Sequence, residues 1–221
     1  MLRIEDKYLL SEYDFIKTKE IMEAVLPMDQ GGQYKISSLY FDDIYDTDLH
    51  NTVDGNPQRR KLRIRIYNDS LSTIKLEVKN KRYSRIEKFS ESISLEEMQK
   101  LMNGEMVSWN DDYELAPRNT FNERIISARL RPKVIVTYER CAYCYDSGNT
   151  RITFDTNIRA SDQVELFGKT DLHHEKIHGN DAILEVKYNE FMPDFIDKMF
   201  GIGDMQQASF SKYRLCREVF G

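Results

Sequence analysis

The sequence has little cysteine and no long hydrophobic run. Only 3 of its 221 residues are cysteine, an odd number in a long chain, which argues against a disulfide framework. No apolar stretch approaches the roughly 18 residues that span a bilayer, and the start, MLRIEDKYLL, is charged where a signal peptide would be apolar. We therefore expect a cytoplasmic protein without a membrane segment.

Linkers, repeats and low-complexity tracts are also missing, so no composition change marks a domain boundary. With 40% hydrophobic residues, the chain can bury a substantial core, and we expect one domain over residues 1–221. Cys141 and Cys144 form a lone C-x-x-C motif without a second ligand pair at suitable spacing. This favours ordinary packing of the two cysteines over a zinc or redox site.

The charges are unevenly distributed along the chain. The net charge is −5, yet residues 59–88 hold eleven Lys or Arg against three Asp or Glu, a local excess of +8. A concentrated positive zone on an acidic protein indicates an anionic ligand at a defined site. Nucleic-acid binders are more often basic overall, so we expect no nucleic-acid partner.

Alternating hydrophobic and polar residues predict a mainly β protein. In Arg59–Tyr67, for example, Leu62, Ile64 and Ile66 alternate with Arg63 and Arg65. Eight strands are predicted, at residues 2–10, 34–43, 59–67, 73–81, 86–94, 132–145, 150–158 and 182–189. Helices are predicted at 12–26, 94–104, 119–130 and 194–201, the second with a capping box from Ser94 to Glu97. The fold class is therefore α+β.

Charged side chains of both signs line the polar face of strand after strand. A solvated sheet face would show a similar alternation. Two features favour a binding face instead. Arginine, whose planar fork suits phosphate oxygens, dominates several of these faces. Single glutamates stand among the cations, as expected of ligands for a hard divalent cation shared with phosphates. If the sheet closes into a barrel, these side chains line its lumen.

Six motifs in order resemble a known family: SLYFDD with DGNPQRRKLRIRIY, IKLEVKNK, RPKVIVTYERCAY, RITFDTNI, ILEVKYN and SFSKYRL. They are similar to the polyphosphate polymerase domain of the vacuolar transporter chaperone (VTC) complex and its bacterial relatives, here as a stand-alone member. That domain belongs to the triphosphate tunnel metalloenzymes, or CYTH superfamily. The resemblance implies a closed antiparallel barrel of eight strands with a charged lumen and helices outside. It also implies transfer of the terminal phosphate of ATP to polyphosphate, with Mn²⁺ or Mg²⁺.

The resemblance also implies site residues. The catalytic set is Lys7, Arg63, Arg65, Lys79, Arg140, Arg151 and Lys212, and Glu185 is a metal ligand. We add Lys75, Lys88 and Lys187 as substrate-binding residues and Glu5 and Glu77 as further metal ligands, because they face the same way or lie in the same motifs. The chain departs from the family at Arg3, where the superfamily has glutamate, and at Ser209, where the polymerase motif has lysine.

Alternative functions remain open at this point. Attack by water instead of a phosphate would make the same site a triphosphatase, and a module that only binds polyphosphate is a third hypothesis. A zinc peptidase is a remote fourth, since HEKIH (174–178) matches H-E-x-x-H, a motif that requires a helix. Close glycines at 168 and 179 favour a charged connector there.

Overall fold

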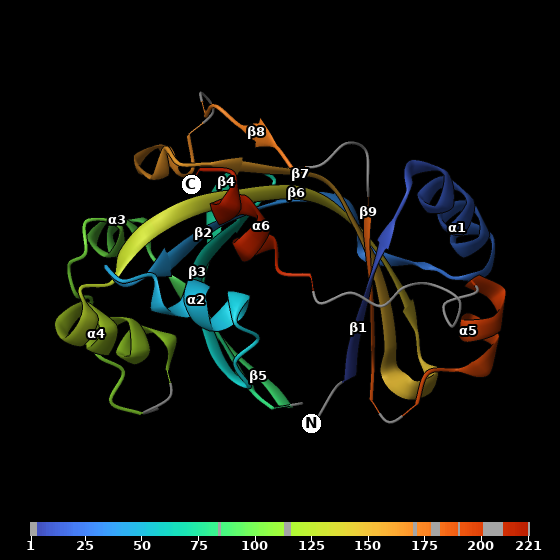
Figure 1. Ribbon diagram of the computed structural model, residues 1–221, viewed down its shortest axis with the longest axis horizontal. Helices are drawn as coiled ribbons and strands as arrows, with labels where there is room; N and C mark the ends of the chain where they lie inside the picture. Colours follow the sequence, from blue (N-terminus) through green and yellow to red (C-terminus); the bar gives the residue numbers. More distant parts are fainter. Residues whose placement is uncertain are drawn as a thin grey trace. The chain divides into compact units, whose positions relative to one another are not determined.

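The computed structural model describes residues 4–83, 85–112, 116–169, 172–177, 182–189, 191–200 and 210–220. Its strands are β1 (Ile4–Leu10), β2 (Met28–Asp42), β3 (Gln58–Tyr67), β4 (Ser70–Arg82), β5 (Arg85–Ile93), β6 (Arg131–Tyr145), β7 (Thr150–Ser161), β8 (Glu175–Lys176) and β9 (Ala182–Tyr188). Its helices are α1 (Glu12–Val25), α2 (Thr47–Val53), α3 (Leu95–Met102), α4 (Pro117–Ala128), α5 (Asp194–Phe200) and α6 (Lys212–Glu218) (Figure 1). None of the helices in these ranges combines the length and apolar character needed to cross a bilayer.

The strands form a mainly antiparallel sheet in the order β1-β9-β7-β6-β2-β3-β4-β5, with β8 paired to β7. All eight predicted strands are present, but the predicted eight-stranded closed barrel is wrong. The sheet has nine strands and is open, because within the described chain β1 pairs only with β9 and β5 only with β4. Alternation specifies which face a strand buries, but it does not specify whether the outermost strands pair with each other.

Two compact units divide the chain. Unit 1 contains Met1–Lys35, Tyr138–Ile158 and His178–Phe210, and unit 2 contains Ile36–Thr137, Arg159–Ile177 and Ser211–Gly221. The strands β2, β6 and β7 each contribute residues to both units. One domain over residues 1–221 stays a prediction.

The core of unit 1 lies between its strands and two helices. In Figure 1, α1 and α5 lie beside each other on one side of β1 and β9. Met22 of α1 and Ile196 of α5 are fully buried against Leu184, Ile152 and Phe154 of the strands. Cys141 is one of the buried residues of this core, which agrees with the predicted packing role for this cysteine. The opposite face of the same strands is left for polar side chains.

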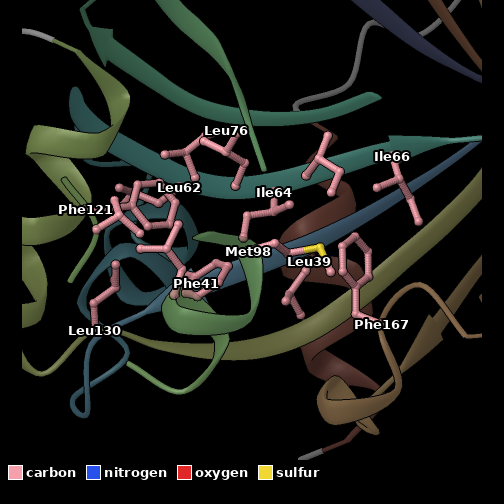
Figure 2. Close-up of a cluster of buried hydrophobic side chains, with 14 of the residues drawn as sticks. Leu39, Phe41, Leu62, Ile64, Ile66, Leu76, Met98, Phe121, Leu130 and Phe167 are labelled. Carbon is pink, nitrogen blue, oxygen red and sulfur yellow. The ribbon is translucent and has the colours of Figure 1, made fainter. Parts of the chain in front are cut away.

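The core of unit 2 is built in the same way (Figure 2). Leu62, Ile64 and Ile66 of β3 are at most 1% exposed and pack with Met98 of α3 and Phe121 of α4. The predicted alternation in Arg59–Tyr67 is thus confirmed for its apolar residues. The aliphatic side chains meet the helices, so Arg63 and Arg65 project from the other face of the sheet.

The predicted helices are present, and their ends follow local chemistry. Ser94 and Glu97 form the predicted capping box at α3, with Ser94 Oγ accepting from Glu97 N at 3.1 Å and Glu97 Oε2 accepting from Ser94 N at 2.9 Å. Beyond the helix, Gly104 has φ +75°, a conformation that suits glycine at a helix end. Such local signals made α3 predictable from the sequence.

The helices α2 and α6 were missed because a side chain outside each helix, Asp42, holds both. Asp42, fully buried at the end of β2, accepts hydrogen bonds from the first-turn amides of Asp48 and Leu49 in α2. The same carboxylate accepts a 2.7 Å bond from the Tyr213 hydroxyl of α6. One buried carboxylate therefore orders α2, which follows it closely in sequence, and α6, which lies 171 positions further along the chain.

Glu175 and Lys176 of the HEKIH segment form the short strand β8, paired with Ala160 and Arg159 of β7. A strand places residues four apart differently from a helix, so the helical context required of a zinc peptidase is absent there. His178 lies outside the described residues. The zinc-peptidase hypothesis is therefore wrong for the described part of this motif.

Candidate functional site

Predicted site residues share one face of the strands in unit 1. Residues that pair directly across antiparallel strands point to the same side. One such row is Glu5, Lys187 and Arg151, and the next is Lys7, Glu185 and Thr153, across β1, β9 and β7. The alternate residues, such as Tyr8, Leu184 and Phe154, belong to the apolar core on the other side.

Glu5, Lys7, Glu185 and Lys187 form a cluster of two carboxylates and two ammonium groups, the carboxylate–lysine cluster. Lys7 Nζ lies 2.6 Å from Glu5 and 3.8 Å from Glu185, and Lys187 Nζ lies 3.7 Å from Glu5 and also contacts Glu185. Burial disfavours the charged Lys7, but the carboxylates of Glu185 and Glu5 outweigh it and raise the pKa of Lys7. The cluster therefore favours the charged form of Lys7.

The two carboxylates of this cluster suit a divalent cation. Their side chains are only 6–8% exposed, and Mg²⁺ is commonly held by one or two carboxylates plus phosphate and water oxygens. No three His, Cys, Asp or Glu side chains in the described chain are grouped to hold a metal ion. Glu5 and Glu185 therefore fit a metal that shares its coordination with a phosphate ligand, rather than an all-protein metal site.

Arg140 is fixed beside this face by a residue outside the predicted set. The carboxylate of Asp155 accepts bonds from Arg140 Nε at 2.6 Å and Nη2 at 2.7 Å. The guanidinium carbon also lies 5.3 Å from the ring centre of Tyr138. The carboxylate and the tyrosine ring are both planar groups, and together they fix the orientation of the planar guanidinium in the ligand-free protein.

Arg151 is held more loosely than Arg140. Its Nη2 donates to Asp29 at 2.7 Å and to the Tyr34 hydroxyl at 3.4 Å, and its side chain is 34% exposed. Its Nε is buried and has no hydrogen-bond partner. This donor is one of the few buried polar atoms that lack a partner in the described chain.

In unit 2, three predicted cations converge on Glu77, and we call these four residues the Glu77 cluster. Glu77 Oε2 accepts from Arg63 Nε at 2.7 Å and lies 3.6 Å from Arg65 Nη1, while Oε1 pairs with Lys88. Burial by itself would raise the pKa of Glu77, but Arg63, Arg65 and Lys88 together lower it to about 2. The carboxylate is thus charged at every physiological pH.

The Glu77 cluster carries an excess of positive charge. Burial lowers the pKa of Lys88, opposed by Glu77 and supported by the like charges of Arg63 and Arg65. One carboxylate cannot neutralise three cations, so an incoming anion meets a positive surface. Tyr40 accepts from Arg63 Nη1 at 2.8 Å, and its neutral hydroxyl leaves this charge unchanged.

A row of lysines lies beside the Glu77 cluster. Lys61, Lys79 and Lys88 are direct neighbours across β3, β4 and β5. Like charges directly opposite each other destabilise a sheet, so this row, which we call the lysine row, favours a bound anion. Two residues from Glu77 in the other direction along β4, Lys75 lies opposite Arg65 and donates to Ser92 at 2.8 Å.

Lys212 is the first residue of α6 rather than a strand residue. Ser211, which caps the helix, accepts a 2.8 Å bond from Lys61 Nζ, so the start of α6 lies at the lysine row. Ser209 lies outside the described residues. The structure thus brings the predicted residues together in two groups, one in each unit.

The sequence analysis missed the residues that hold the cations. Asp155, Tyr40, Tyr34 and Asp29 contact predicted arginines, and none was assigned to the site. Alternation alone would have found Tyr40, which is paired with Arg63 and lies between the apolar Leu39 and Phe41. The contact of Asp29 with Arg151 spans 122 positions and has no local signal.

The model of the VTC domain matches residues 2–220. The chain belongs to the VTC domain family. A search of curated proteins gave no match for this VTC domain.

Solved structures share the fold at low sequence identity. A proposed adenylate cyclase from Bacillus halodurans is 14% identical with a TM-score of 0.59, covering 96% of both chains. HpAC1 from Hippeastrum, a proposed adenylyl cyclase described as having a dominant triphosphatase activity, is 13% identical with a TM-score of 0.59, covering 99% of this chain and 95% of its own. PH1819 from Pyrococcus horikoshii OT3 is 13% identical with a TM-score of 0.51, covering 98% of this chain and 99% of its own. This VTC domain therefore has the fold of these proteins.

Proposed function

We propose that this VTC domain catalyses metal-dependent phosphoryl transfer, moving the terminal phosphate of ATP onto a polyphosphate chain and releasing ADP. Membership of the VTC family is one support. The observation that carries the proposal is that Arg and Lys from separate strands converge on the polar faces of both units, around the carboxylate–lysine cluster and Glu77. Such faces suit a ligand with many phosphate oxygens.

The proposed roles follow from the contacts. Phosphates are bound by the cations of both units. In unit 1 these are Lys7, Lys187, Arg140 and Arg151, and in unit 2 they are Arg63, Arg65, Lys75, Lys79, Lys88 and Lys212. Glu5 and Glu185 hold Mn²⁺ or Mg²⁺, which when bound would neutralise charge on the transferred phosphate. A metal role for Glu77 stays a prediction, since three cations already surround it.

Fixed cations account for the chemistry without a protein nucleophile. Phosphoryl transfer depends mainly on placing the attacking and leaving oxygens in line and on neutralising charge. Donors whose orientation is set in advance, such as Arg140 on Asp155, stabilise charge without reorganising during the reaction. The proposed site residues are therefore of the types that such a reaction uses.

A triphosphatase is the second candidate function. HpAC1, which shares the fold, is described as having a dominant triphosphatase activity. The same cations and carboxylates would serve water as the attacking group. The identity of the acceptor, rather than the charges of the site, separates the two functions.

Incubation with ATP and Mn²⁺ distinguishes the functions by their products. Polymer together with ADP supports the polymerase, and free phosphate with ADP and no polymer supports the triphosphatase. Absence of ADP, with binding of tripolyphosphate retained, contradicts both and leaves a binding module. Omitting the metal or substituting Ca²⁺ tests the metal requirement. The cytoplasmic location and the absence of a nucleic-acid partner stay predictions.

The control for this assay lies on the same strand as the key arginines. Arg63→Ala removes a cation of the Glu77 cluster, whereas Arg60 lies on the other face of β3 and donates to Asn80 at 3.1 Å. Arg60→Ala should retain product formation when Arg63→Ala loses it. Equal losses in both variants would point to a damaged strand instead of a damaged site.

A further inference from the structure

Thr153 is a buried hydroxyl without a partner. It lies on β7, is 2% exposed, and its Oγ1 is buried without a hydrogen bond. Most buried side-chain polar atoms have at least one partner, so this exception calls for an explanation. Valine has nearly the shape of threonine and would fill the same space without an unsatisfied hydroxyl.

The position of Thr153 supplies that explanation. It pairs directly with Glu185, which in turn pairs with Lys7, so the three side chains form one row on the polar face of unit 1. Two residues away on the same face of β7 stand Arg151 on one side and Asp155 on the other. Thr153 is therefore flanked by side chains of the candidate site.

A second donor on β7 is also buried and without a hydrogen-bond partner. Arg151 Nε is buried and without a hydrogen bond, and Arg151 stands two residues from Thr153 on the same face, a backbone separation of roughly 7 Å. Two donors without partners at this spacing suit a ligand that carries several acceptor oxygens. Phosphate oxygens of a linear chain supply such acceptors, and Lys7 stands in the same row to neutralise them.

We propose that Thr153 is a ligand-binding residue whose hydroxyl donates to a phosphate oxygen of the triphosphate or polyphosphate ligand. The proposal rests on the proposed function and adds a neutral donor to its set of cations. Thr153 binds the ligand beside Lys7 and Arg151, and its hydroxyl gains a partner only in the complex.

Thr153→Val tests the proposal, with binding of tripolyphosphate followed by calorimetry in metal-free buffer so that turnover plays no part. We expect affinity to fall about tenfold, the value of one hydrogen bond to a charged acceptor. The unfolding midpoint of the ligand-free protein should stay the same or rise, because an unsatisfied buried hydroxyl is removed. Unchanged affinity in Thr153→Val would overturn the proposal.

Two further variants separate the hydroxyl from the packing. Thr150, on the same strand and equally buried, donates to the Ser147 carbonyl at 3.0 Å. Thr150→Val should lower the unfolding midpoint and leave affinity unchanged, the opposite pattern to Thr153→Val. Thr153→Ser should bind within about twofold of the wild type, because it keeps the donor. A tenfold loss in Thr153→Ser would assign the effect to the methyl group and overturn the proposal.

The wild-type protein distinguishes this proposal from the function on which it rests. Tripolyphosphate binding by the wild type with equal binding by Thr153→Val overturns the role of Thr153 alone. Absence of binding by the wild type, with or without Mn²⁺, overturns the proposed function and the role of Thr153 together.

Discussion

Asp155 holds Arg140 through two parallel hydrogen bonds, with the aspartate side chain fully buried and the arginine 10% exposed. A buried pair of this kind orients its arginine, but removal of one partner leaves an uncompensated charge. Asp155 therefore connects the stability of unit 1 to the geometry of the candidate site.

Asp155→Asn is expected to destabilise the protein by ~3–5 kcal/mol, the usual cost of breaking a buried ion pair. Denaturant unfolding measures it. Asp29→Asn is the matched control, because the Asp29 pair with Arg151 is about one-third exposed on both sides and should contribute only ~0–1 kcal/mol. Similar costs for the two variants would contradict the difference in burial.

Asp48 predicts a pH dependence of stability. Burial, followed by the neighbouring charge of Asp42, raises the pKa of Asp48 from 3.8 to about 7 despite Arg124. A raised folded-state pKa contributes stability at pH below 3.8 that is lost as pH rises towards 7. Asp48→Asn should therefore gain on the order of a few kcal/mol over the wild type at pH 8 and little at pH 4.

Thermal unfolding of the Asp48→Asn variant and the wild type at pH 4, 6 and 8 provides the measurement. The difference between the two should widen as pH rises. Asp54→Asn serves as a control at the other end of α2, outside the buried cluster of Asp42 and Asp48. A constant difference between Asp48→Asn and the wild type at all three values would rule out titration of Asp48 in this range.

Glu77→Gln tests a pH dependence of stability opposite in sign to that of Asp48. The folded-state pKa of about 2 lies below the ordinary 4.5, so the carboxylate contributes stability above pH 4.5 that is lost as pH falls through 2. At pH 7 the variant leaves Arg63, Arg65 and Lys88 without their shared carboxylate, and we expect a loss of ~3–5 kcal/mol. Between pH 3 and 2 the gap from the wild type should close.

An added anion should rescue the Glu77→Gln variant. Tripolyphosphate can neutralise the three cations in place of the carboxylate, so it should raise the unfolding temperature of Glu77→Gln more than that of the wild type. Chloride at matched ionic strength is the control for screening. Equal shifts with both salts would show that the Glu77 cluster does not bind this anion.

The conservative substitution Arg63→Lys separates charge from geometry. Arg63 uses Nε and Nη2 on Glu77 and Nη1 on Tyr40, a fork that a lysine cannot reproduce. We expect about a tenfold loss in tripolyphosphate affinity with the net charge unchanged. Arg60→Lys, on the other face of β3, should bind as the wild type does, and a loss there would contradict the assignment of faces.

Much of the fold was predictable because burial acts on alternate residues. Leu62, Ile64 and Ile66 must leave water, and this alone determined that Arg63 and Arg65 face the other way. The helix α3 was predictable because Ser94 and Glu97 cap it locally. By contrast, α6 depends on Asp42, which is 171 positions away, and closure of the sheet depends on backbone pairing that no side-chain pattern encodes.

The candidate site was predictable in its residue types and directions, but not in its contacts. Periodicity placed Glu77 among cations, yet it could not show that Arg63, Arg65 and Lys88 would enclose one carboxylate. The partner of Arg140 is 15 positions away on another strand, so only the structure identifies Asp155. An unsatisfied hydroxyl such as that of Thr153 is a property of three-dimensional burial and has no sequence signal.

The lysine row has a practical consequence for anyone who handles this protein. Lys61, Lys79 and Lys88 bring three like charges together although Glu77 pairs with Lys88, so under the proposed function we expect the composition of the buffer to affect the stability of the protein. Protein kept in phosphate will be more resistant to heat than protein kept in a zwitterionic buffer of equal pH. If the proposed site binds phosphates, affinities for tripolyphosphate measured in phosphate buffer should be weaker, because the buffer anion competes for the same cations.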